Sequence, residues 1–221
     1  KFESPGDKGE LYYIGFGVSD YANDTLDLGY AHRDVLDLKN TFMKMEGKKF
    51  GKVHCAAFVD RDVTVKNIAR AKKLLEKARV NDTVVLFVAG HGMHDNDGDK
   101  TYYFLTHNAD MKNLPQTAAK FELIEDLLSG IKPRQKLFLL DTCESGELDE
   151  TMLKTASVVE SSRGVRARVI RTGKNRGIQL ATRRKRREYL LDRNRYIYND
   201  LFRRTGAIVF SSCRGDELSY E

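Results

Sequence analysis

Two residues that could cooperate chemically, a histidine and a cysteine, each follow a strongly apolar run. His91 comes after Thr83 to Ala89 and Cys143 comes after Lys136 to Leu140, and both runs have the composition of buried strands. A thiol acts as a nucleophile when a base lies near the sulfur, and a tetrahedral intermediate needs N–H donors. Neighbouring parallel strands would bring both residues to one edge of a sheet, where the backbone amides of Gly92 and Cys143 could form an oxyanion hole. We therefore predict Cys143 as nucleophile and His91 as its acid/base partner.

Each residue also has a simpler interpretation. A buried cysteine is usually a small hydrophobe, and a histidine between glycines is often only a turn residue. A metal site built from His91, His94 and Asp95 is a further alternative, but it lacks the helical spacing or the cysteine pairs of zinc sites. The placement of both His91 and Cys143 at strand ends favours catalysis, and we predict no metal ligands.

The segments around these residues alternate between strand and helix patterns. Apolar runs predict strands at 11–18, 53–59, 83–89, 102–105, 136–140, 156–159 and 206–210. Amphipathic spacing predicts helices at 31–45, ending near Gly47, and at 65–78 and 121–128. This alternation predicts an α/β fold, a three-layer sandwich with a mostly parallel central sheet and helices on both faces. In such sheets active residues collect at the carboxyl ends of the strands.

Bulk composition is that of an ordinary globular chain. The 221 residues are 41% hydrophobic and 32% charged, and no apolar run reaches the roughly 18 residues that a membrane helix needs. The three cysteines form no close pair, so we expect free thiols in a reducing compartment and a cytoplasmic location. The chain begins at Lys1 without a secretory signal, and we expect further domains in a longer protein.

The positive charge is concentrated in one segment. Residues 161–205 carry fifteen Lys and Arg against three acids, while the whole chain has a formal charge of +6. Such a local concentration favours a linker or insertion over a surface that follows nucleic acid. Binding of nucleic acid through Arg183 to Arg187 remains an alternative, although regularly interleaved aromatic residues are lacking.

The sequence resembles a known family in four places. VVLFVAGHG and KLFLLDTCESG resemble the histidine and cysteine motifs of caspase-like cysteine peptidases, and are more similar to those of metacaspases and bacterial orthocaspases than to those of animal caspases. YYIGFGVSDY with YAHRDVLDL resembles the opening strand and first helix, and AIVFSSCRGDELSYE resembles the start of the small subunit. The histidine lies 52 residues before the cysteine, close to the spacing of about 50 in caspases.

The resemblance implies a caspase-like sandwich and endopeptidase activity. It also implies a large-subunit-like region at 1–160, a basic linker or insertion at 161–205 and a truncated small-subunit-like start at 206–221, all within one structural domain. A catalytically silent homologue that acts as a scaffold or regulator is the main alternative, since fold does not fix function.

Substrate preference follows from a difference within the family. Animal caspases cleave after Asp, whereas metacaspases cleave after Arg or Lys with an acidic S1 pocket. The matching positions here are Asp34 and Asp141, which implies polypeptide substrates with a basic P1 residue. A structural alternative is that Asp34 stabilises a helix N-terminus and Asp141 accepts loop amides.

An acidic S1 pocket would make the basic segment a substrate of the enzyme itself. Relatives often mature by cleavage between the two subunits, and exposed loops are preferred cleavage sites. The candidate P1 residues are Arg163, Arg166, Arg168, Arg171, Lys174, Arg183, Arg184, Lys185, Arg186 and Arg187. The alternative is an insertion that stays intact.

Many metacaspases bind calcium through a cluster of acidic residues. The matching positions in this chain fall near Thr101 and Lys120 to Phe121. These residues are poor ligands for a cation that takes several carboxylates. The acidic turn with Asp95, Asp97 and Asp99 could substitute, but a solvated turn is the simpler interpretation. We therefore expect no calcium requirement and no other cofactor.

Overall fold

The computed structural model describes residues 8–95, 101–144 and 203–212. Within these ranges a seven-stranded sheet has five parallel strands in the order β2-β1-β3-β6-β7. These strands are β1 (Leu11–Gly17), β2 (Val53–Val59), β3 (Thr83–His94), β6 (Gln135–Glu144) and β7 (Ile208–Ser211). Two short antiparallel strands, β4 (Tyr102–Phe104) and β5 (Ala119–Lys120), extend the sheet beside the last residues of β3.

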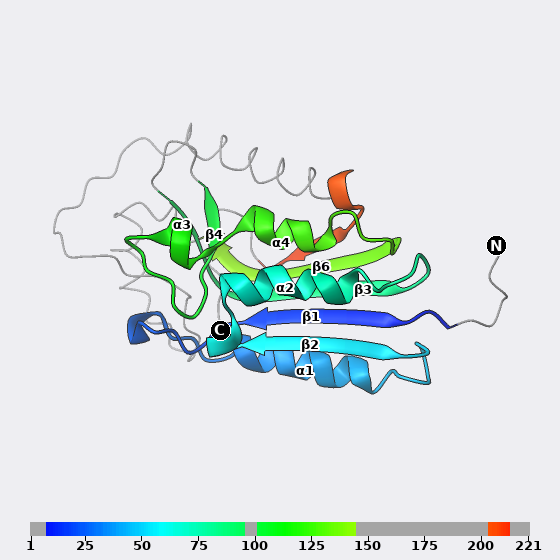
Figure 1. Cartoon of the computed structure of the whole chain (residues 1–221). Coiled ribbons are helices and arrows are strands. Elements are labelled where there is room, and N and C mark those ends of the chain that lie inside the picture. Colours follow the sequence, from blue (N-terminus) through cyan, green and yellow to red (C-terminus); the bar gives the residue numbers. More distant parts are fainter. Residues whose placement is uncertain (1–7, 96–100, 145–202, 213–221) are drawn as a thin grey trace, which may run out of the picture.

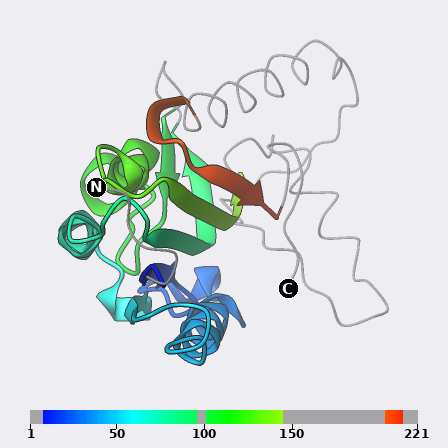
Figure 2. The same cartoon turned by 90° about the vertical axis from the view of Figure 1, so that its right-hand side faces the viewer.

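Helices lie on both faces of this sheet. Figure 2 shows α2 and α4 on one side of the strands and α1 on the other. The helices are α1 (Ala31–Met43), α2 (Val65–Leu75), α3 (Leu114–Thr117) and α4 (Phe121–Leu128), with short 3-10 helices η1 (Asp24–Leu26) and η2 (Asp60–Asp62). The predicted α/β sandwich with a mostly parallel sheet is confirmed.

The central strand β3 separates two apolar cores. Val84, Leu86 and Val88 belong to the core under α2 and α4, while Val85 and Phe87 belong to the core under α1. Because successive side chains of a strand point to opposite faces, one apolar run serves both layers. This explains why the run lacks polar alternation in the sequence.

Two strands are longer than the sequence predicts. β3 continues to His94 and β6 continues to Glu144, because each finds a partner beyond the predicted end. The parallel ladder of β3 with β6 extends to the pair Gly92 and Glu144, and β4 pairs with β3 from Gly92 onward. His91 and Cys143 therefore lie inside strands, and the prediction that they directly follow strands is wrong.

Smaller differences concern helix ends and short elements. The first helix ends at Met43 rather than near Gly47, and the second ends at Leu75, after which Ala78 is still buried. The elements α3 and β5 have four and two residues, which is too short for a periodic pattern to predict them.

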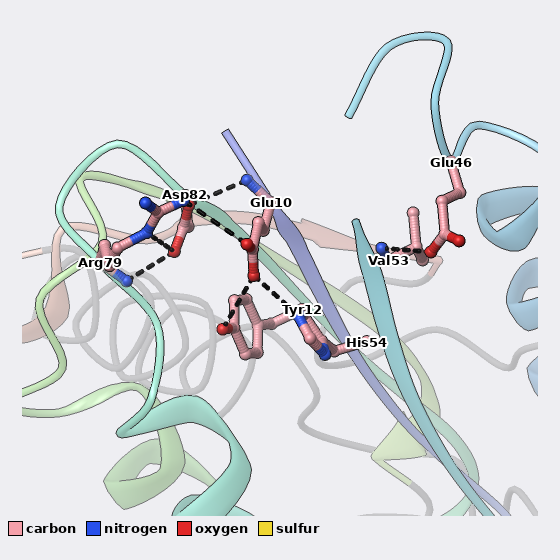
Figure 3. A network of polar contacts seen from close by, with 7 residues as sticks. All are labelled: Glu10, Tyr12, Glu46, Val53, His54, Arg79 and Asp82. Atoms are coloured by element: carbon pink, nitrogen blue, oxygen red, sulfur yellow. Dashed lines mark hydrogen bonds and ion pairs between the residues drawn. The ribbon is translucent and has the colours of Figure 1, made fainter. Parts of the chain in front are cut away.

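A polar network joins the amino ends of three parallel strands (Figure 3). The Glu10 carboxylate accepts a hydrogen bond from Nε2 of His54 at 2.7 Å and lies 3.6 Å from the Arg79 guanidinium. The buried Asp82 carboxylate accepts the backbone N–H groups of Glu10 and Arg79 at 2.8 and 2.6 Å. The Tyr12 and His54 rings stack at 4.5 Å. The network fixes the end of the sheet that lies farthest from His91.

Some predicted features lie outside the described residues. They are the strand at 156–159, almost all of the basic segment at 161–205 and every candidate cleavage site in it. Within the described ranges, each helix is too short or too polar to cross a membrane.

Candidate active site

The parallel ladder between β3 and β6 pairs the Cα of His91 with the Cα of Cys143. Adjacent parallel strands lie about 4.8 Å apart, so the backbone brings the two residues to one register position. They occupy the carboxyl end of the sheet, which in Figure 1 is the end to which the β1 and β2 arrows point. Sheets of this class bind their ligands at this end.

His91 is buried and its imidazole is held by a backbone carbonyl. The residue is only 2% exposed. Its Nε2 lies 2.9 Å from the carbonyl oxygen of Leu26 in η1. A carbonyl only accepts, so Nε2 must carry the proton in this bond. In the neutral ring this leaves the basic lone pair on Nδ1. The fold thus selects which nitrogen can exchange a proton.

The two predicted acids lie on α1 and on β6. Asp141 lies two residues before Cys143 in β6, and its Oδ1 accepts a hydrogen bond from the Ser212 hydroxyl at 2.6 Å. Asp141 follows Leu137 and Leu139, which pack in the core under α1, so alternation places it on the same face. Asp34 is half-buried in the first turn of α1. Both acids therefore lie on the α1 side near the carboxyl ends of the strands.

The segment after β1 fixes the start of α1. Ser19 Oγ accepts the backbone N–H of His32 at 3.1 Å, which satisfies one of the free donors at the helix N-terminus. A Cβ on Gly17 would overlap the carbonyl oxygen of Ala31, so the glycine allows α1 to approach the end of β1. This close approach sets the position of Asp34.

The predicted oxyanion donors are diagonal neighbours across the same ladder. Gly92 follows His91 and pairs with Glu144, the residue after Cys143. Their backbones thus lie beside the paired histidine and cysteine.

Among the described residues, no group of three or more His, Cys, Asp and Glu is suited to a metal ion, and the absence of metal ligands stays a prediction. His94 lies three residues after His91 on one strand, so the two rings project to opposite faces. The His94 ring packs against Tyr102 with centroids 4.9 Å apart. Asp97 and Asp99 lie outside the described residues, and the expectation about calcium stays a prediction.

Comparison with known proteins agrees with this architecture. The family model described as the caspase domain matches residues 14–221. This chain belongs to the caspase domain family. Its peptidase family model makes the chain a relative of cysteine peptidases, as the motifs at His91 and Cys143 predict.

Solved structures extend the comparison to the fold. The crystal structure of protein GSU0716 from Geobacter sulfurreducens has a TM-score of 0.56 and 15% sequence identity, covering 95% of this caspase domain and 75% of that chain. At this identity the likeness concerns the fold alone. No curated protein matches the chain.

Sequence reasoning missed the residues that hold the histidine of the caspase domain. Leu26 acts through its carbonyl and therefore leaves no side-chain signal. Tyr21 accepts the backbone N–H of His91 through its hydroxyl. Its neighbours Ser19, Asp20 and Asn23 are turn-forming residues, so the sequence there indicates only the end of a strand. Both lie 65 to 70 positions before His91, so only folding brings them to it.

Proposed function

We propose that this caspase domain is a cysteine endopeptidase in which Cys143 is the nucleophile and His91 the acid/base. The observation that carries the proposal is the register pair His91 and Cys143 on β3 and β6. The bond from His91 Nε2–H to the Leu26 carbonyl supports it, because it orients the ring and leaves Nδ1 to take the thiol proton.

The reaction would run in two stages. His91 accepts the proton of the thiol, the sulfur attacks the scissile carbonyl carbon, and the backbone amides of Gly92 and Cys143 stabilise the oxyanion. The imidazolium then protonates the leaving amine as the C–N bond breaks, which leaves a thioester. A water molecule loses a proton to His91, attacks the thioester and releases the carboxylic acid and the thiol.

Peptide hydrolysis by matched variants tests this assignment. We expect Cys143→Ala and His91→Ala each to abolish cleavage of an Arg-P1 fluorogenic peptide while circular dichroism shows an unchanged fold. Cys55→Ala, which removes a thiol from β2 far from this end of the sheet, is the control and should keep its activity. Turnover that survives in Cys143→Ala would refute the assignment.

A preference for Arg or Lys at P1 is the second part of the proposal. Asp34 and Asp141 support it, because two carboxylates on one side of the site attract a guanidinium and repel an acidic side chain. Asp34→Asn should lower kcat/KM for the Arg peptide by about 10-fold to 100-fold, since a hydrogen bond to a charged group contributes about 1.5 to 3 kcal/mol. Asp37→Asn, one turn later on the exposed side of α1, should change little. A peptide library cleaved mainly after Asp would overturn this part.

Self-processing in the basic segment is the third part. Its support is the composition of that segment together with the anchoring of the chain that follows it. Lys136 Nζ donates to the Thr205 carbonyl at 2.7 Å, and β7 pairs in parallel with β6. The piece after a cut would therefore remain bound to the sheet.

Mass spectrometry of the purified chain tests self-processing. Fragments that end in Arg or Lys between Arg163 and Arg187 should accumulate in the wild type and not in Cys143→Ala, and they should co-elute in gel filtration. Equal intactness of the two proteins after prolonged incubation would show that the segment is not a substrate.

A further inference from the structure

The central strand β3 changes its hydrogen-bonding partner at His91. One edge of β3 pairs with β6, and up to Ala89 the other edge pairs with β1. The last bond of the ladder with β1 runs from the Val18 N–H to the Ala89 carbonyl at 3.1 Å. From Gly92 onward that same edge pairs with β4. The backbone of His91 therefore lies in the gap between the end of one neighbour and the start of the next.

The hydroxyl of Tyr21 fills this gap. It accepts the backbone N–H of His91 at 3.0 Å, while the His91 carbonyl accepts the N–H of Leu105 at 2.9 Å. A buried N–H needs an acceptor, and here a side chain replaces the missing strand carbonyl. The Tyr21 ring also lies against the imidazole, with centroids 5.3 Å apart. One side chain thus contacts both the backbone and the ring of His91.

Gly90 leaves the room that this hydroxyl occupies. A Cβ at this position would lie 2.9 Å from the Tyr21 hydroxyl, and φ is +146°, a value that favours glycine. Both the Tyr21 hydroxyl and the backbone conformation therefore favour glycine before the histidine.

The segment that carries Tyr21 is itself fixed at several points. The Tyr21 N–H donates to the Asp27 carboxylate at 2.8 Å, and the Asp60 carboxylate accepts the N–H groups of Ser19 and Asp20 at 2.8 and 2.9 Å. The same segment leads to Leu26, whose carbonyl holds Nε2 of His91. Tyr21 and Leu26 thus belong to one segment that contacts His91 at both its backbone and its ring.

We infer that Tyr21 is a positioning residue for His91, an inference that rests on the proposed peptidase function for its effect on activity. Its hydroxyl sets the backbone of His91 and its ring limits rotation of the imidazole, so that Nε2–H points to the Leu26 carbonyl and the lone pair stays on Nδ1. Loss of the hydroxyl would let the ring shift, and small displacements of a catalytic group are costly to the rate.

Tyr21→Phe tests the inference because it removes the hydroxyl and keeps the ring. We expect kcat for the Arg-P1 peptide to fall about 10-fold while KM stays within about twofold, the pattern of a group that acts on the chemical step. Tyr13→Phe is the matched control, since it removes another buried tyrosine hydroxyl, which donates to the Val35 carbonyl at 2.9 Å. It should lose comparable thermal stability and keep its kcat.

A spectroscopic readout separates this inference from the peptidase proposal. In protein labelled with ¹⁵N-histidine, and with His91 assigned through His91→Ala, the neutral ring should show the Nε2–H tautomer in the wild type and in Tyr13→Phe. Tyr21→Phe and Gly90→Ala should both show increased Nδ1–H. If that change occurs in a protein that cleaves no peptide, the positioning inference stands and the peptidase proposal falls. If kcat and tautomer in Tyr21→Phe match those of Tyr13→Phe, the inference is wrong.

Discussion

The protonation pattern of His91 depends on atoms that belong to distant residues. A neutral imidazole can carry its proton on either nitrogen, and the difference is small in water. The Leu26 carbonyl, 2.9 Å from Nε2, decides between them. The tautomer of the residue at the centre of the proposed mechanism is therefore set by a main-chain acceptor.

Thiol reactivity should distinguish Cys143 from Cys55. Burial in β2 raises the pKa of the Cys55 thiol, so little of it is thiolate at neutral pH, and the thiolate is the reactive form. With limiting iodoacetamide at pH 7.5, peptide mapping should find Cys143 modified first, and Cys55 modified faster only as the pH rises. His91→Ala should slow the reaction of Cys143 and leave that of Cys55 unchanged.

Equal rates for the two thiols in the wild type would contradict this expectation. Tryptic peptides separate them from Cys213, which lies outside the described residues.

At the scale of elements, the turn after β2 controls the segment after β1. Asp60 adopts a left-handed φ of 49° in η2, and its Oδ1 accepts two backbone N–H groups of the neighbouring segment. That segment caps α1 through Ser19 and holds His91 through Tyr21. Asp60 follows β2, which pairs with the edge of β1 that faces away from β3. It thus supports both the proposed base and the helix that carries Asp34.

Asp60→Gly should weaken this support without straining the backbone, because glycine accepts the positive φ. The free energy of unfolding should fall by about 1 to 2 kcal/mol for the lost hydrogen bonds, and hydrolysis of the Arg peptide should slow. Asp60→Asn, which keeps an acceptor oxygen, should recover most of both. Urea unfolding and peptide kinetics provide the two measurements.

Asp62→Gly adds a glycine to the same turn and serves as the control. If it matches Asp60→Gly in stability and activity, the effect belongs to turn flexibility and not to the Asp60 carboxylate.

At the scale of the whole molecule, two groups of polar residues lie at opposite ends of the sheet. The carboxyl ends carry His91, Cys143 and Asp141, while the amino ends carry the network around Asp82 and Glu10 (Figure 3). The apolar cores on both faces join the ends. Stability and activity should therefore respond to different substitutions.

Asp82→Ala tests this division. Asp82 is fully buried and accepts two backbone N–H groups, so its loss removes two partly buried hydrogen bonds to a charged group, at a cost of roughly 1 to 3 kcal/mol in unfolding free energy. The activity per folded molecule should stay unchanged, because the site lies at the other end of the strands. Glu76→Ala, an exposed acid at the end of α2, should change neither quantity. Reduced kcat in fully folded Asp82→Ala would show that the two ends are coupled.

The sequence by itself determined the layers and indicated the residues on which the proposed chemistry depends. Apolar runs located β1, β2 and α4 almost to the residue, because strands buried on both faces and amphipathic helices leave a local pattern. The glycine-flanked His91 and the strand before Cys143 pointed to a shared sheet edge for the same reason.

Only the tertiary structure decided how the histidine is held. The last residues of β3 pair with β4 at Phe104, and the last residues of β6 pair with β3 at Gly92. These partners are distant in the sequence. The Leu26 carbonyl has no side-chain signature. The Tyr21 hydroxyl acquires its role only because the pairing of β3 with β1 ends at Ala89 and its pairing with β4 begins at Gly92. Local patterns record which face a residue buries, whereas the donor or acceptor opposite a given atom is set by the packing of separate segments.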